Sequence, residues 1–125
     1  STIIGDDGNC QFRAISLVLH NDQEMHEVVR SEVVNYIKTH RDHYETYISP
    51  LKFEDYVEEM SKNQKWGDEI TLQAASKKYD LPVVVLSESK NGLYVEKYGE
   101  SVKSDGLFSG LFFKSKHYEI LLKTN

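Results

Sequence analysis

Residues 7–15 read DGNCQFRAI, a polar turn that leads directly into an apolar segment. Aspartate, glycine and asparagine favour a turn, and the spacing of the apolar residues predicts a helix over about residues 10–20 that is buried on most sides. Cys10 therefore stands at a helix N-terminus, where the helix dipole stabilises a thiolate. The turn also leaves backbone N–H groups beside the sulfur, as an oxyanion hole requires. A buried cysteine that packs as a small hydrophobe is the alternative.

Three further helices are predicted from apolar residues that recur with a period of about 3.6. They cover about residues 23–40, a short stretch after Pro50, and about residues 69–79, the last with Asp68 as its N-cap. In the first of them the charged residues, Arg30 included, are expected on the polar face.

Strand patterns follow the helices, starting with a continuous apolar run that contains three valines. The predicted strands cover residues 81–86, 93–98, 107–113 and 117–123, and Asn91-Gly92 forms a hairpin turn between the first two. Residues 41–49 carry no firm pattern. Helices followed by strands predict an α+β domain, with helices packed on a mostly antiparallel sheet.

The composition narrows the classes of function. The chain has 125 residues and a net charge of −5, so we expect a single domain over residues 1–125. Its start at Ser1 rather than Met is consistent with a domain excised from a longer protein. Basic residues are scattered, which argues against nucleic acid as a partner, and no apolar run approaches the roughly 20 residues of a membrane helix. The single cysteine suits a reducing compartment, cytoplasm or nucleus, and we expect a monomer.

His117 is the histidine best placed to activate a thiol. It opens the last predicted strand, where Glu119 shares its face because residues i and i+2 of a strand point the same way. A carboxylate beside an imidazole can fix its tautomer, as the third member of a catalytic triad does. An exposed His–Glu pair at a strand end is the alternative. His40 and His43 have helical spacing, but without a third nearby ligand we expect no metal site and no cofactor.

Three segments resemble motifs of the ovarian-tumour (OTU) family of cysteine proteases. Residues 7–15 are similar to the motif around the family's catalytic cysteine. Residues 66–75 (WGDEITLQAA) are similar to its Trp-Gly stretch and the helix that follows, and residues 117–119 (HYE) to its catalytic histidine motif. The resemblance covers essentially the whole chain. It implies a papain-like OTU fold, with a mostly antiparallel central sheet packed between helices.

The resemblance further implies a thiol-dependent deubiquitinase, with ubiquitin or polyubiquitin as its partner. Such an enzyme hydrolyses the isopeptide bond between the C-terminal glycine of ubiquitin and a lysine. Cys10 then attacks the carbonyl carbon, and His117 takes the thiol proton. The other implied site residues are Asp7, which shapes the turn, Gly8 and Asn9, whose backbone forms the oxyanion loop, and Trp66 and Gly67, which line a channel for the ubiquitin tail. For Trp66, a place in the core is the alternative.

Glu119 departs from the family pattern, in which the residue two after the histidine is Asn or Asp. Glutamate is one methylene longer, so Asp6 and Asp7 are alternative groups to orient His117. Two other functions stay open. One is a ubiquitin-binding module with little activity, and the other is a cysteine peptidase that acts on a ubiquitin-like modifier or a polyprotein.

Overall fold

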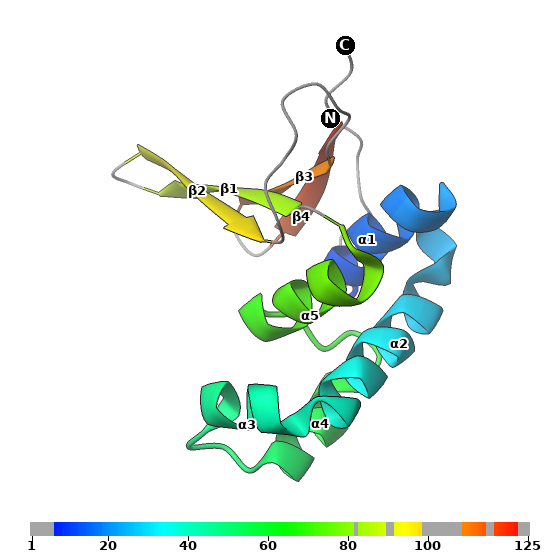
Figure 1. The fold of residues 1–125 in the computed structure, drawn as a ribbon. Coiled ribbons are helices and arrows are strands. Elements are labelled where there is room, and N and C mark those ends of the chain that lie inside the picture. The colour runs from blue at the N-terminus through cyan, green and yellow to red at the C-terminus, as the bar shows by residue number, and fades with distance from the viewer. Residues whose placement is uncertain (1–6, 82, 90–91, 99–108, 115–116, 123–125) are drawn as a thin grey trace.

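The computed structural model describes the backbone of residues 7–81, 83–89, 92–98, 109–114 and 117–122, and the side chains of residues 7–81 and 83. Helices come first along the chain and strands second (Figure 1). The α-helices are α1 (Cys10–His20), α2 (His26–Thr39), α3 (Arg41–Ile48), α4 (Phe53–Met60) and α5 (Glu69–Tyr79), and a 3-10 turn, η1 (Gln23–Met25), precedes α2. The strands are β1 (Val83–Ser89), β2 (Gly92–Tyr98), β3 (Ser109–Lys114) and β4 (His117–Leu122).

The helices predicted from periodicity are confirmed, with boundaries within a few residues. Asp68 caps α5 as expected: its carboxylate accepts from the Thr71 N–H at 2.9 Å, and the Thr71 hydroxyl accepts from the Asp68 N–H at 2.9 Å. Helix α3 was missed because only Tyr44 and Ile48 among its residues are buried, too few to show a period in eight residues.

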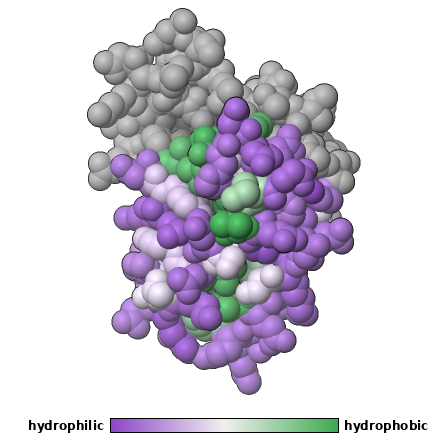
Figure 2. All heavy atoms as spheres, turned by 90° about the vertical axis from the view of Figure 1, so that its right-hand side faces the viewer, coloured by the Kyte–Doolittle hydropathy of each residue, from purple (hydrophilic) through white to green (hydrophobic). Residues whose placement is uncertain are grey.

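The core lies between the helices and the sheet. Helix α1 contacts both α2 and β4, and α2 contacts α5, so α1 packs between α2 and the sheet. The most deeply buried apolar side chains of these helices include Phe12, Ala14, Ile15, Val29, Val33, Ile37, Leu72, Ala74 and Ala75. The coloured residues in Figure 2 are mostly hydrophilic, with hydrophobic residues in small groups among them. Within the described part of the chain, no helix has the length and apolar content needed to cross a membrane.

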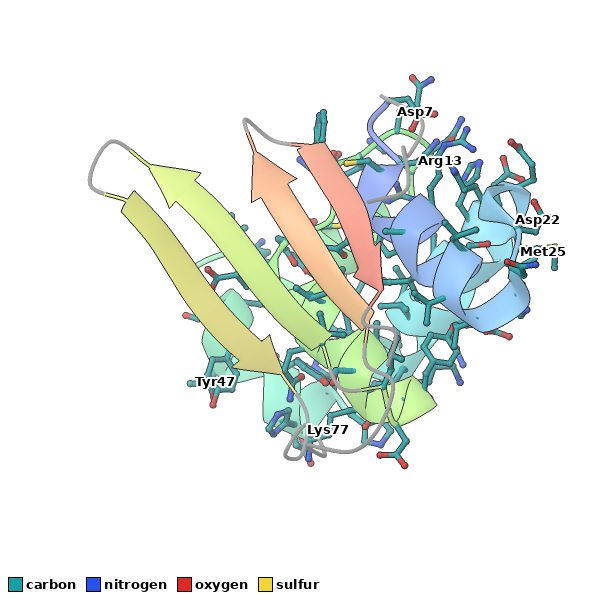
Figure 3. The ribbon with its side chains drawn as sticks, turned by 90° about the horizontal axis from the view of Figure 1, so that it is seen from above. Asp7, Arg13, Asp22, Met25, Tyr47 and Lys77 are labelled. Atoms are coloured by element: carbon teal, nitrogen blue, oxygen red, sulfur yellow. The ribbon has the colours of Figure 1, made fainter. Side chains whose placement is uncertain are left out.

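The strands form one sheet in the order β2-β1-β3-β4. The pairs β1–β2 and β3–β4 are antiparallel, whereas the central pair β1–β3 is parallel. All the described helices lie on one face of the sheet (Figures 1 and 3), so the expected sheet packed between helices is not confirmed. Asn91, of the predicted hairpin turn, lies outside the described residues. The sheet matters for function because its edge strand β4 lies against α1 and so brings the last motif of the chain beside the first.

Candidate active site

The turn before Cys10 is closed by the side chain and the carbonyl of one residue, Asp7. Its carboxylate accepts from the Asn9 N–H at 3.0 Å, and its carbonyl accepts from the Cys10 N–H at 3.2 Å. Arg13, one turn into α1, donates to the same carboxylate through Nε at 3.2 Å and Nη2 at 3.0 Å (Figure 3). The bond from Arg13 holds the pKa of Asp7 below its ordinary value, although burial acts the other way. Asp7 is therefore an ionised clamp on the turn.

Cys10 is the first residue of α1 and is fully buried. The first turn of α1 contains no acidic residue, so within that turn nothing offsets the positive end of the helix dipole. Strand β4, which begins at His117, lies against this same helix. The thiol-bearing helix and the histidine-bearing strand are thus neighbours, although they come from opposite ends of the chain.

Asn9, the N-cap residue of α1, directs its side chain away from the helix and into the loop after α4. Its Nδ2 donates to Asn63 Oδ1 at 2.8 Å, and its Oδ1 accepts from the Gln64 N–H at 2.8 Å. Gly8 lies so close to Gln64 that an added Cβ would overlap the Gln64 carbonyl. The turn before Cys10 and the loop before Trp66 are therefore held in direct contact.

Trp66 is 39% exposed, so it is not the core residue that the sequence left as an alternative. Gly67 lies against the side chain of Gln11, which leaves no room for a Cβ. The Gln11 amide in turn donates to the Asp68 carbonyl at 3.1 Å and accepts from the Thr71 hydroxyl at 2.7 Å. The Trp-Gly stretch is thus anchored to the residue that follows the cysteine.

The side chains of His117 and Glu119 lie outside the described set, and their backbones are part of β4. His117 pairs with Lys114 and Glu119 with Phe112 across the antiparallel β3–β4 ladder. Asp6, one alternative group to orient the imidazole, also lies outside the described residues. Asp7, the other, already binds Arg13 and the turn, so its carboxylate is committed to shaping the loop. The histidine–carboxylate pair stays a prediction.

Comparison with known proteins decides the family. The family model described as "OTU-like cysteine protease" matches residues 5–118. The chain belongs to the OTU family. A relative in Arabidopsis thaliana, "OVARIAN TUMOR DOMAIN-containing deubiquitinating enzyme 10", is 38% identical over 92% of the chain, which spans 32% of that relative's length.

Solved structures show the same fold. The OTU domain of OTUD1 superposes with a TM-score of 0.84 at 20% identity, covering 98% of this chain and 84% of that one. The structure titled "Structure of the Hazara virus OTU bound to ubiquitin" gives a TM-score of 0.78 at 14% identity, covering all of this chain and 82% of that one. These likenesses confirm the OTU fold expected from the three motifs, but not the expected packing of the sheet between helices.

The sequence pattern predicted the wrong environment for one residue near the site of this OTU domain. Arg30 was expected on the polar face of α2, yet it is only 4% exposed. The spacing along α2 could have predicted this burial. Arg30 is four residues after the buried His26 and three or four before Val33 and Val34, which are also buried. An arginine on an apolar helical face is a candidate for a buried structural or functional role.

Among the described residues no group of three or more His, Cys, Asp or Glu side chains could hold a metal ion, and this includes the surroundings of His40 and His43.

Proposed function

We propose that this OTU domain is a thiol-dependent deubiquitinase that cleaves the isopeptide bond after the C-terminal glycine of ubiquitin. The observation that carries the proposal is the placement of Cys10 at the start of α1, beneath a turn clamped by Asp7, with the strand that begins at His117 against the same helix. The name of the Arabidopsis relative and the ubiquitin bound to the Hazara virus domain support ubiquitin as the partner.

In the proposed reaction His117 accepts the Cys10 proton, and the sulfur attacks the carbonyl carbon of the terminal glycine. The tetrahedral intermediate collapses when His117 donates that proton to the leaving lysine amine, which leaves a thioester. Water, deprotonated by His117, then attacks the thioester and releases the ubiquitin carboxylate and the Cys10 thiol. Glu119, on the same strand face as His117, is assigned the orienting role.

The oxyanion needs N–H donors that point at the position beside the sulfur where the carbonyl oxygen becomes negatively charged. The Asn9 N–H already serves the Asp7 carboxylate at 3.0 Å, whereas the Cys10 N–H makes a longer bond, 3.2 Å, to the Asp7 carbonyl. We assign the Cys10 N–H to the oxyanion, because a negatively charged acceptor competes well with a long neutral bond. Asp7 and Gly8 then act by keeping the turn in shape, and Trp66, which is exposed on the adjoining loop, lines the path of the ubiquitin tail.

The test is reaction with a ubiquitin probe that carries a C-terminal electrophile, read by intact mass. A single adduct is expected on the native domain, none on Cys10→Ala, and slower labelling of His117→Ala. His20→Ala is the matched histidine control, since His20 is exposed at the far end of the same helix, and it should label at the native rate. Cleavage of ubiquitin chains by Cys10→Ala at the native rate would refute the proposal.

Two other results would redirect the function. A folded domain that binds ubiquitin but forms no adduct would be the binding module, and Glu119→Asn, which restores the family residue, would be the next variant. Labelling by the probe of a ubiquitin-like modifier, and not by the ubiquitin probe, would identify a peptidase for that modifier.

A further inference from the structure

Arg30 lies at the point where α2, the turn before Cys10 and the loop before Trp66 meet. Its Nη1 donates to the Met60 carbonyl at 2.8 Å, at the end of α4. Its Nη2 donates to Asn9 Oδ1 and to the Lys65 carbonyl, each at 2.8 Å. The acceptors Asn9 and Lys65 each directly precede a proposed site residue, the nucleophile in one case and the channel wall in the other.

The Arg30 charge is stabilised by neutral oxygen acceptors rather than by a paired carboxylate. Among the described residues no carboxylate pairs with it, and its hydrogen bonds run to carbonyl and amide oxygens. Its guanidinium lies 4.3 Å from the centre of the Phe12 ring, and Nε finds no hydrogen-bond partner within the described part of the chain. Burial lowers the pKa of Arg30 to about 10, so it stays protonated at neutral pH. Asp7 attracts this charge only through space, without a salt bridge. A buried cation that lacks a directly paired carboxylate costs stability, so we expect a compensating benefit in the loops that it joins.

Asn9 is the link between Arg30 and the active site. Its Oδ1 accepts from Arg30 and from the Gln64 N–H, and its Nδ2 donates to Asn63. An asparagine held by three partners can adopt one orientation only. Because Asn9 is covalently joined to Cys10, that orientation also sets the direction of the Cys10 N–H and the position of the sulfur.

We propose that Arg30 is a positioning residue that locks the turn before Cys10 to the loop before Trp66, so that nucleophile, oxyanion donor and channel wall keep one relative geometry. The proposal rests on the proposed function. The planar guanidinium fork is essential to it, because Arg30 reaches acceptors on separate segments with fixed directions. A lysine ammonium keeps the charge but has no such fork.

The experiment compares Arg30→Lys with Arg41→Lys as a matched control. Arg41 also stacks on a ring, 4.7 Å from the centre of Phe53, and binds two carboxylates, but it lies on the exposed surface of α3. We expect kcat for a fluorogenic ubiquitin C-terminal amide to fall about tenfold or more in Arg30→Lys, with KM within about twofold, because a misplaced site loses transition-state contacts. Arg41→Lys should keep both constants within about twofold.

A second variant covers the case in which Arg30→Lys fails to fold. Asn63 is exposed, and Asn63→Ala removes one partner of Asn9 while leaving Arg30 in place. Its kcat should fall about threefold to tenfold without a matching rise in KM. Native kcat in every folded variant, or a change confined to KM, would overturn the proposal.

Amide hydrogen exchange separates this proposal from the proposed function. Arg30→Lys should speed exchange in both residues 7–10 and residues 61–66, and Arg41→Lys in neither. If the native domain proves inert toward ubiquitin while this pattern is found, the positioning role stands and the deubiquitinase function falls. If exchange in both segments is unchanged in Arg30→Lys, the positioning role is wrong whatever the activity.

Discussion

Gly8→Ala should damage catalysis far more than it damages the fold. An ideal Cβ at Gly8 would overlap the Gln64 carbonyl and lie 2.8 Å from the Gln64 Cα. Ordinary carbon–carbon contact is about 3.5–4.0 Å, and the Gln64 carbonyl atoms are nearer still, so the turn and the loop must separate by at least about 1 Å. Neither side can yield by a rotamer change, because the clash is with backbone.

The size of each effect follows from that displacement. Overpacking of this kind costs about 1–3 kcal/mol of unfolding free energy. A shift of about 1 Å at reacting groups can lower the rate about 100-fold, and Gly8 is two residues from the proposed nucleophile. We therefore expect labelling by the ubiquitin probe to slow about 100-fold while the domain stays folded.

Probe labelling and thermal unfolding should be measured together, with Ile48→Val as the control. Ile48 is buried in α3, away from the turn, and its truncation costs about 0.5–1.5 kcal/mol, a loss comparable with the lower end of that expected for Gly8→Ala. The control should label at the native rate. Native labelling by a folded Gly8→Ala, or equal slowing in both variants, would refute the argument that the close approach of the two loops sets the active geometry.

Two other predictions concern stability. Tyr56 is buried and its hydroxyl donates to both Asp68 carboxylate oxygens at 2.9 Å, so Tyr56→Phe should lower the free energy of unfolding by about 1.5–3 kcal/mol. The control Tyr79→Phe removes an exposed hydrogen bond to the Glu32 carboxylate and should lower the free energy of unfolding by less than about 1 kcal/mol. Equal losses in the two variants would contradict the argument that burial makes the Tyr56 bond the stronger one. The hydrogen bond from Arg13 lowers the pKa of Asp7 in the folded chain. Ionised Asp7 therefore stabilises the fold above the ordinary carboxyl pKa, and this stabilisation is lost as the pH falls through the pKa that Asp7 has in the folded chain. Chemical denaturation should find Asp7→Asn less stable than the native domain by about 1 kcal/mol or less at about pH 6, and this difference should shrink as the pH falls through the folded pKa of Asp7. A difference that stays constant into acid would argue against the Asp7–Arg13 pair as its source.

Local features of the fold could be predicted from the sequence because their causes act within a few residues. The apolar period sets helices α1, α2, α4 and α5, and the Asp68 carboxylate sets where α5 begins. The turn formers before Cys10 put the thiol at a helix start for the same reason. The motifs at both ends of the chain were also sufficient for the family, which the comparison confirms.

Tertiary packing decided the rest. Arg30 carries a charge that local rules assign to solvent. Only the arrival of the end of α4 and of two loops at its helix face supplies the carbonyl and amide oxygens that let it be buried. The parallel pairing of β1 with β3 depends on which edge of β1 is left free by β2, a choice between distant segments. The packing of α1 against β4 is likewise a contact between distant segments of the chain. Apolar periodicity, capping residues and turn residues report on interactions between residues that are close in sequence. The contacts of Arg30, the β1–β3 pairing and the packing of α1 on β4 join residues far apart in sequence, so they form only when the core is assembled.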